Sequence, residues 1–322
     1  MKAAVYYETG GPEVFRYEDV PDPACPDAGV VVEVQAISVE GGDTLHRGGG
    51  VMAARPHVVG YQCAGAVREV GGSVRHLARG DRVVAVMPHG SHAARAAVPE
   101  ATAWRIPDGV DLEAAACVPI AVGTADDCLF EFGRLQAGET ALVHAGAGGV
   151  GMAAIQLAKR AGATVLATAS SDAKLARLKE FGLDHGINYR DSDFVAAVRE
   201  ATGGRGADVV LDSIGGHTLE KSIEATAYRG RIAFVGSAGR DDHRPDPAAL
   251  RPGNKTLVGV FFGAELAVHH ERVHAMVARH IADVGSGALR IEIDRRFPLS
   301  EAAEAHRYIE SRQAFGRVLL IP

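Results

Sequence analysis

The 322-residue sequence lacks long apolar runs, clusters of basic residues and an apolar leader. No stretch of apolar residues approaches the length that crosses a bilayer, and the first residues, MKAAVYYETGG, contain no signal core. We therefore expect no membrane association and a cytoplasmic location. The net charge of −6, without a basic run, argues against nucleic acid as a main partner.

Cysteine is also scarce, and its spacing excludes two further classes. The four cysteines are far apart and form no C-x-x-C pair, which argues against a zinc ribbon and against a disulfide framework. We expect reduced, buried thiols at Cys25, Cys63, Cys117 and Cys128. The 47% hydrophobic and 23% charged composition is that of a globular protein with a sizeable core, and the length predicts about two domains.

The chain divides into two regions with different sequence patterns. Up to about residue 118 short β-type runs alternate with Gly, Pro and Asp, which predicts a compact β barrel or sandwich. These candidate strands cover residues 2–7, 30–39, 58–70, 81–87 and 92–98. From residue 115 strands and helices alternate, which predicts a parallel, doubly wound α/β sheet. Its candidate strands are 140–145, 164–169, 186–189, 207–214, 231–236 and 256–262, with helices at 152–162, 194–201 and 218–228. A helix and two closing strands, 291–297 and 317–322, are expected to return to the first domain.

A glycine-rich turn is the strongest motif in the sequence. Gly146, Gly148 and Gly151 have G-x-G-x-x-G spacing between a strand and a helix, and the strand at 164–169 completes a βαβ unit. The first glycine allows the turn, the second lets the backbone approach a pyrophosphate, and the third lets helix and strand pack closely. The pattern predicts a dinucleotide at the helix start; a tight turn without a ligand is the alternative.

The end of the next strand favours NADPH over NADH. Where NAD-binding proteins carry a carboxylate, this strand ends in Thr168, Ala169, Ser170 and Ser171, and Lys174 follows one helical turn later. Hydroxyls and an amine suit a 2′-phosphate. Alternatives remain: a serine there can cap the helix, Lys174 can be solvated surface, and Asp172 can turn back to the ribose.

The sequence resembles the zinc-independent quinone oxidoreductases, relatives of zeta-crystallin in the medium-chain dehydrogenase/reductase superfamily. The resemblance covers essentially the whole chain and is carried by segments 118–151, 182–190, 229–239 and 310–322. It implies a GroES-like β-rich catalytic domain from residues 1–119 and 263–322, a Rossmann domain from residues 120–262, bound NADPH and a homodimer. Carried over by position, the cofactor-binding residues are Thr124 near the nicotinamide, Gly146, Gly148, Gly149, Val150 and Gly151 under the pyrophosphate, Ser170, Lys174 and Tyr189 around the 2′-phosphate, and Arg312 near the cleft.

Zinc-dependent members of the superfamily hold their metal with residues that this chain does not have. Ser38 and Tyr61 stand where those members carry a cysteine and a histidine, and neither replaces these ligands. The resemblance therefore implies no metal and direct hydride transfer to an electrophilic acceptor, a quinone or an α,β-unsaturated carbonyl.

The chain departs from the family pattern at two positions of the expected substrate cleft. The family's N-x-x-D-x-x-x-R motif begins here with Glu40 and retains Asp43 and Arg47, whereas Gln62 replaces a glutamate in G-x-E-x-A-G. We interpret the two changes as a reciprocal exchange that keeps one carboxylate and one amide in contact; independent drift is the alternative. The candidate catalytic residues are Glu40, Asp43, Tyr61 and Gln62.

The source of the product proton stays open at this point. A hydride added to an enone leaves an enolate that takes a proton from a side chain or from water. Tyr61, His46 and His92 belong to the first domain and are candidates, with packing or surface roles as the alternative.

Three other functions remain as alternatives. One is an enoyl reductase of a biosynthetic pathway, and another is a protein that binds NADPH without turnover. The third is a zinc hydrolase, because His270 and His274 belong to an H-E-x-x-H sequence and His280 follows. On a continuous helix His280 would point about 80° away from His270, which argues against this ligand set.

Overall fold

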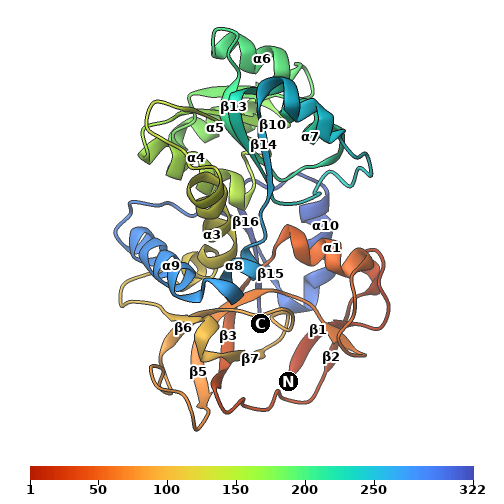
Figure 1. The fold of residues 1–322 in the computed structure, drawn as a ribbon. Coiled ribbons are helices and arrows are strands. Elements are labelled where there is room, and N and C mark those ends of the chain that lie inside the picture. Colours follow the sequence, from red (N-terminus) through yellow and green to blue (C-terminus); the bar gives the residue numbers. More distant parts are fainter. The chain divides into compact units, whose positions relative to one another are not determined.

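The computed structural model describes all 322 residues of the chain. They form two compact units, one from residues 1–120 and 265–322 and the other from residues 121–264. In Figure 1 the first unit therefore contains both the red and orange start of the chain and its blue end. No helix is both long enough and apolar enough to span a membrane.

The first unit is built around a seven-stranded sheet. Its order is β15-β16-β3-β5-β6-β8, with β7 also paired to β3, and only the β15–β16 pair is parallel. The strands are β3 (Gly29–Ser38), β5 (Gln62–Val70), β6 (Arg82–Val86), β7 (Arg95–Pro99), β8 (Ala103–Arg105), β15 (Ile293–Pro298) and β16 (Arg317–Ile321). Because β16 pairs with β3, the closing strands return to the first domain, as expected from the sequence.

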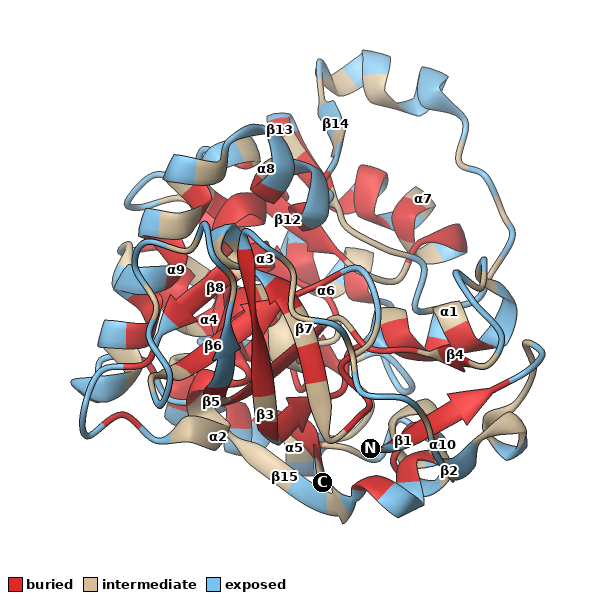
Figure 2. Cartoon of the chain, turned by 90° about the horizontal axis from the view of Figure 1, so that it is seen from below, coloured by how far each residue is buried: buried red, intermediate tan, exposed pale blue.

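The centre of this sheet is apolar and β-branched. Residues 30–34 of β3 include four valines, a composition that suits a pleated, buried surface. Figure 2 draws most of β3 in the colour of buried residues. Val32, Ile37, Val83 and Leu320 belong to one hydrophobic core that joins β3, β6 and β16.

A smaller sheet and several helices complete the first unit. The sheet has the order β2-β1-β4, formed by β1 (Lys2–Tyr6), β2 (Arg16–Asp19) and β4 (His57–Val58). The helices are α1 (Gly41–Gly49), α2 (Leu112–Ala115), α9 (His270–Gly285) and α10 (Ala302–Glu310), with 3₁₀ turns at Pro12–Val14, Glu100–Thr102 and Leu299–Glu301.

The second unit is a six-stranded parallel sheet of order β11-β10-β9-β12-β13-β14. Its strands are β9 (Thr140–Val143), β10 (Thr164–Ala169), β11 (His185–Asn188), β12 (Ala207–Asp212), β13 (Thr226–Phe234) and β14 (Thr256–Gly259). The strand order reverses between β9 and β12, and in such sheets ligands bind outside the carboxyl ends of the strands at this point.

Helices connect the strands of the second unit. They are α4 (Gly149–Arg160), α5 (Asp172–Leu178), α6 (Phe194–Ala201) and α7 (Gly216–Ala225). Helix α8 (Phe262–Val268) follows the last strand and crosses residue 264, where the second unit ends. Helix α3 (Gly123–Asp126) precedes β9 and lies between π-helical turns at Val118–Val122 and Asp127–Phe132. Short 3₁₀ turns cover Lys179–Phe181 and Pro247–Gly253. Side-chain caps fix two helix starts: Ser171 accepts from the amide of Lys174, and Asp193 accepts from the amides of Val195 and Ala196.

Several element boundaries differ from those predicted. The expected strand 58–70 is broken at residues 59–61, where Gly60 has a φ of +113° that a strand does not tolerate. The helix expected over 218–228 ends at Ala225, because Thr226 already pairs with Ala207 in the parallel sheet. Strands β2 and β8 and helix α10 were not predicted.

Candidate functional site

The glycine turn lies between β9 and α4, and the structure separates the roles of its three glycines. A Cβ on Gly151 would lie 2.4 Å from the backbone oxygen of Ala145, and one on Gly146 would lie 2.9 Å from the Cβ of Ala167. A Cβ on Gly148 would meet only the oxygen of Ala145, at 3.4 Å. Internal packing therefore requires Gly146 and Gly151, whereas the space over Gly148 is open to a ligand.

The structure shows how Ala145 and Gly146 share the work of forming this turn. The residue with a left-handed backbone is Ala145, with a φ of +52°, and not Gly146. Gly146 is needed instead because Ala167, Leu178 and Ile155 all lie within 3.3 Å of where its Cβ would be. The turn itself is closed by the amide of Gly148, which donates to the carbonyl of Ala145 at 2.9 Å.

Helix α4 begins with amide donors and no competing anion. Gly148 is its N-cap and makes no side-chain bond, so the amides of Gly149, Val150 and Gly151 belong to the first turn that a helix leaves without internal acceptors. The first turn contains no acidic residue. The positive end of the helix dipole and these amides suit a phosphate group.

The tips of two neighbouring strands supply the remaining polar groups. Ser170 follows β10, Lys174 lies in the first turn of α5, and Tyr189 follows β11. Because β10 and β11 are adjacent and parallel, these residues share the carboxyl edge of the sheet. Ser171, rather than Ser170, caps α5, so the Ser170 hydroxyl is not used as the cap.

The one nearby carboxylate already has a hydrogen bond. Asp172 Oδ1 accepts from Asn188 Nδ2 at 3.2 Å, and the same amide donates to Asp191 Oδ2 at 2.6 Å. This bond holds the Asp172 carboxylate toward the end of β11. The geometry therefore favours the phosphate-type strand tip over a ribose-binding carboxylate.

A second polar group is buried in the first unit around Glu40. Its carboxylate accepts from Gln62 Nε2 at 2.5 Å, from Ser38 Oγ at 3.3 Å and from the guanidinium of Arg317. Arg317 also donates to Ser38 Oγ at 2.5 Å and to the carbonyl of Val39 at 3.1 Å. The buried carboxylate is thus paired with a buried cation and with an amide, which is what its burial requires.

The contact between Glu40 and Gln62 is the one that the reciprocal exchange requires. Gln62 is fully buried, donates to Glu40 and accepts from the amide of Ile120 at 3.1 Å. A glutamate at position 62 would place a second carboxylate against Glu40 in this apolar setting. With one carboxylate and one amide, the Gln62–Glu40 and Ile120–Gln62 hydrogen bonds both form while only one negative charge is buried.

Asp43 lies beside this group, in the first turn of α1. Its Oδ2 accepts from the amide of Glu40 at 2.7 Å and caps the helix, while Oδ1 is buried without a hydrogen-bond partner. Burial raises the pKa of Asp43 well above its usual value, although the Glu40 amide opposes this shift. Burial thus shifts the equilibrium of Asp43 toward its protonated form relative to an exposed aspartate.

Tyr61 and His46, two of the three predicted proton donors, are partly exposed and lie close together. Its hydroxyl lies 3.3 Å from the carbonyl of Gly42 and 3.4 Å from Nδ1 of His46. Because Nε2 of His46 lies 2.7 Å from the carbonyl of Val51, that nitrogen carries the hydrogen and Nδ1 can accept from Tyr61. Burial raises the pKa of Tyr61, so the phenol keeps its proton at neutral pH.

Two other polar residues of the first unit have structural contacts. His92 is fully buried, lies 3.1 Å from His306 between their Nε2 atoms, and burial lowers its pKa to about 3. An uncharged, enclosed ring does not fit a proton donor. Arg47 is also buried, pairs with Glu310 at 2.6 Å and donates to the carbonyl of Gly10 at 3.0 Å.

Two further predicted cofactor residues, Thr124 and Arg312, belong to other segments of the chain. Thr124 is buried in α3, and Arg312 is exposed between α10 and β16 with a φ of +60°. Thr124 belongs to the second unit and Arg312 to the first. Their contacts with a cofactor stay predictions.

Arg317 and the network around His144 were not predicted from the sequence. Nδ1 of His144 lies 3.1 Å from Thr168 Oγ1, and its Nε2 lies 3.0 Å from Ser222 Oγ, which donates to Asp212 at 2.7 Å. The Asp212 carboxylate also accepts from the amides of Ile214 and Gly215. The only sequence signal for Arg317 was a charged residue opening an otherwise apolar strand.

Comparison with known families matches both units. Residues 26–108 match the alcohol dehydrogenase GroES-like domain, and residues 149–281 match the domain described as zinc-binding dehydrogenase. A quinone oxidoreductase of Pseudomonas aeruginosa is 34% identical over 97% of this chain and 97% of its own. A 2-haloacrylate reductase of a Burkholderia species is 33% identical over 100% of this chain and 99% of its own. The chain belongs to the zinc-independent quinone oxidoreductase family.

Solved structures of family members have the same fold. The quinone oxidoreductase of Pseudomonas syringae pv. tomato superposes with a TM-score of 0.95 at 30% identity, covering 100% of this chain and 99% of its own. The Escherichia coli quinone oxidoreductase, in complex with NADPH, superposes with a TM-score of 0.94 at 28% identity over the full length of both chains.

Ser38 and Tyr61 stand at the positions of two zinc ligands in the zinc-dependent relatives, and their surroundings in this chain do not suit a metal ion. Ser38 Oγ accepts from the guanidinium of Arg317, so a buried cation already occupies its surroundings. Tyr61, at the other position, has its hydroxyl directed to Gly42 and His46. A dication beside Arg317 would meet like charge and a neutral hydroxyl in place of a thiolate.

The H-E-x-x-H sequence lies at the start of helix α9. Helix α9 continues unbroken through His280, and Nε2 of His270 lies 2.5 Å from the carbonyl of Ala101. Nε2 of His274 lies 3.4 Å from the carbonyl of Ala103, and its ring stacks on Trp104. Both imidazoles thus contact the segment that leads into β8, which does not fit a hydrolytic zinc site.

Proposed function

We propose that this chain is an NADPH-dependent oxidoreductase that transfers hydride to a quinone or an α,β-unsaturated carbonyl without zinc. The observation that carries the proposal is the carboxyl edge of β9, β10 and β11. At this edge the first turn of α4 has amides without internal acceptors, and Ser170, Lys174 and Tyr189 lie at the ends of the neighbouring strands. The nearby carboxylate of Asp172 is hydrogen-bonded to Asn188. The E. coli relative was solved with NADPH, which supports the same cofactor here.

The residues present fit this cofactor. The amides of Gly149, Val150 and Gly151 would hold the pyrophosphate, because the surface over Gly148 is free of side chains. Ser170, Lys174 and Tyr189 would hold the 2′-phosphate. The bound nicotinamide supplies a hydride, and the protein contributes positioning and a proton.

In the first unit, we propose that the cluster around Glu40 positions the acceptor and that Tyr61 donates to it. The Arg317 ion pair and the Gln62 bridge fix the start of α1, and with it the carbonyl of Gly42 that orients the Tyr61 hydroxyl. A neutral phenol stabilises a developing oxyanion by hydrogen bonding and can transfer its proton to the product; the phenolate left behind takes a proton back from water.

The acceptor is best defined by its chemistry. The names of the two relatives point to electron-poor double bonds, in a quinone and in a haloacrylate. Hydride addition to either gives an oxyanion and needs no metal to activate an alcohol. An enoyl thioester of a biosynthetic pathway is the second acceptor class in this proposal. A homodimer and a cytoplasmic location, both expected from the sequence, stay predictions.

Steady-state kinetics with NADPH and NADH, each with 1,4-benzoquinone and with 2-cyclohexenone, test the proposal. We expect NADPH to be preferred by at least about tenfold in kcat/KM, because a 2′-phosphate contact is worth on the order of 1.4 kcal/mol or more. Quenching of cofactor fluorescence without cofactor consumption by any quinone, enone or enoyl thioester would show a binding protein instead.

Lys174→Ala tests the cofactor assignment directly. We expect the KM for NADPH to rise about tenfold and the KM for NADH to stay within about twofold, because only NADPH carries the 2′-phosphate. Lys179→Ala is the matched control, since Lys179 is exposed just past the end of the same helix. An equal effect of Lys174→Ala on both cofactors would contradict a 2′-phosphate contact.

A further inference from the structure

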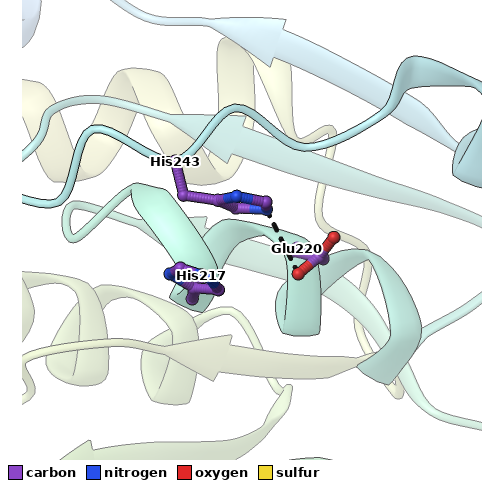
Figure 3. A group of neighbouring side chains, drawn as sticks. All are labelled: His217, Glu220 and His243. Atoms are coloured by element: carbon purple, nitrogen blue, oxygen red, sulfur yellow. Dashed lines mark ion pairs between the residues drawn. The ribbon is translucent and has the colours of Figure 1, made fainter.

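Two histidines and a glutamate come together in the second unit, on α7 and the connection between β13 and β14 (Figure 3). His217 and Glu220 lie one turn apart on α7, and His243 comes from the connection between β13 and β14. One ligand atom from each lies within 4.8 Å of the other two. Nε2 of His243 is 3.2 Å from Glu220 Oε2, and the two imidazole rings stack with centroids 4.0 Å apart.

A single carboxylate orients the ring of His217 and holds the backbone of His243. Asp241 Oδ2 accepts from Nδ1 of His217 at 2.7 Å and from the amide of His217 at 2.9 Å, while its Oδ1 accepts from the amide of His243 at 3.0 Å. Because Nδ1 of His217 donates to Asp241, its Nε2 carries a lone pair. A carboxylate that fixes the tautomer in this way is the usual support of a metal-bound imidazole.

The backbone at the start of α7 is adapted to this carboxylate. Gly216 has a φ of +59°, and a Cβ there would lie 2.4 Å from Asp241 Oδ2. Only glycine therefore lets Asp241 approach the helix start so closely. The loop that carries His243 is therefore held against α7 by hydrogen bonds of Asp241 to backbone amides as well as to the His217 side chain.

The charge and exposure of the cluster suit a dication from solvent. The side chains of His217, Glu220 and His243 are 68%, 41% and 29% exposed, so a hydrated ion can reach them and keep water as a further ligand. Two cationic rings stacked at 4.0 Å would repel each other, whereas one dication would satisfy both Glu220 and Asp241 with neutral rings.

We propose that His217, Glu220 and His243 bind one divalent transition-metal ion of the Zn²⁺ class. The ligands are Nε2 of each histidine and the Glu220 carboxylate, a set that zinc accepts with water in the fourth position. Tetrahedral bonds of about 2.0 Å place ligand atoms roughly 3.3 Å apart, which rotations of these exposed side chains can reach. The ion would fasten the β13–β14 connection to α7. This site is distinct from Ser38 and Tyr61 and does not depend on the proposed oxidoreductase activity.

Binding to the purified, chelator-treated full chain tests the site. We expect equilibrium dialysis against Zn²⁺ at about pH 7.5, where neutral imidazoles are available, to give one tightly held ion per chain. His243→Ala and Glu220→Gln should each weaken binding at least tenfold. Asp241→Asn should weaken it about tenfold, because only the orienting carboxylate is lost. The double variant His270→Ala/His274→Ala is the matched control and should bind as the wild type does.

A second readout separates a site from a folding defect. Zn²⁺ should raise the thermal unfolding midpoint of the wild type and leave that of His217→Gln unchanged, while the two proteins unfold at similar temperatures without metal. Bound Co²⁺ should show the visible absorption of a four- or five-coordinate ion. Unchanged affinity in His243→Ala, equal loss in the His270/His274 control, or no saturable binding would each overturn the proposal.

Discussion

The two candidate functional regions use different chemical groups, backbone amides in one and buried side chains in the other. The turn at residues 145–151 consists of backbone amides and glycines, and it presents donors that have no internal acceptor. The cluster around Glu40 consists of buried side chains, and Arg317, Gln62 and Ser38 meet the hydrogen bonds of its carboxylate. One region is prepared for an anion from outside, whereas the other already balances its own charge.

This difference sets how each region responds to change. A backbone site depends on space, because an added methyl group blocks it without altering any charge. A buried side-chain cluster depends on charge balance, because removal of one member leaves another desolvated and unpaired. The following four changes test this distinction, starting with the one of largest expected effect.

Arg317→Met should destabilise the protein most. The change keeps much of the side-chain volume but leaves the Glu40 carboxylate buried without its cation, which typically costs about 3–5 kcal/mol. Urea unfolding monitored by circular dichroism measures the loss. The double variant Arg317→Met/Glu40→Gln should recover a large part of it, because no unpaired charge remains. A loss below about 1 kcal/mol would show that water reaches the carboxylate.

Gly151→Ala should follow, with an expected loss of about 1–3 kcal/mol from overpacking. Its Cβ would lie 2.4 Å from the oxygen of Ala145 and 2.7 Å from the Cα of Gly146, so the turn has to widen. Cofactor binding, followed by fluorescence, should fall with it. Gly148→Ala is the control, since its Cβ meets one atom at 3.4 Å; it should keep normal stability and weaken only cofactor binding. Equal stability of the two variants would contradict the packing role of Gly151.

The pH dependence of stability should show the contribution of buried His92. Buried side chains can titrate, whereas the backbone amides of the glycine turn do not. Burial lowers the pKa of His92 from 6.5 to about 3, so between these values the unfolded chain binds the extra proton and stability falls as pH falls. From about pH 7 to pH 5 this contributes on the order of 2 kcal/mol. Urea titrations of His92→Gln should show a shallower pH slope, whereas the exposed control His185→Gln should leave the slope unchanged.

Tyr61→Phe should have the smallest effect, confined to turnover. The variant removes the proposed proton donor but keeps the ring against Gly42, so kcat with an enone should fall about tenfold because water replaces the phenol. Stability and the KM for NADPH should stay near the wild-type values. An unchanged kcat would show that water, and not Tyr61, protonates the product in the wild-type enzyme as well.

The same distinction explains what the sequence could predict. The glycine turn was predictable because its determinants are within six residues and have fixed spacing. Helix α6 was predicted at Phe194–Ala201 with its observed bounds, since its apolar periodicity and Asp193 cap are local signals. The contact of Glu40 with Gln62 was reached through family positions, and no local pattern indicates it.

Features that depend on distant residues were not predictable. Arg317 meets Ser38 and Glu40 only because β16 pairs with β3, and no periodicity encodes that pairing. The positive φ of Ala145 was not predicted, nor was the contact with Ala167 on the neighbouring strand that requires glycine at position 146. The His217–Glu220–His243 cluster likewise joins a helix and a loop whose path the sequence does not specify.

The pairing of β3 with β16 also has a consequence for biosynthesis. Ser38 and Arg317, which meet across this pair, are 279 residues apart, and all of residues 121–264 lie between them in the chain. At ordinary translation rates β3 waits roughly half a minute on the ribosome for its neighbour, while the intervening unit can fold first. During that interval Ile37 and Ser38 at the end of β3 lack their partners in β16 and Glu40 lacks Arg317, so mutations there should lower yield in cells more than they lower stability in the test tube.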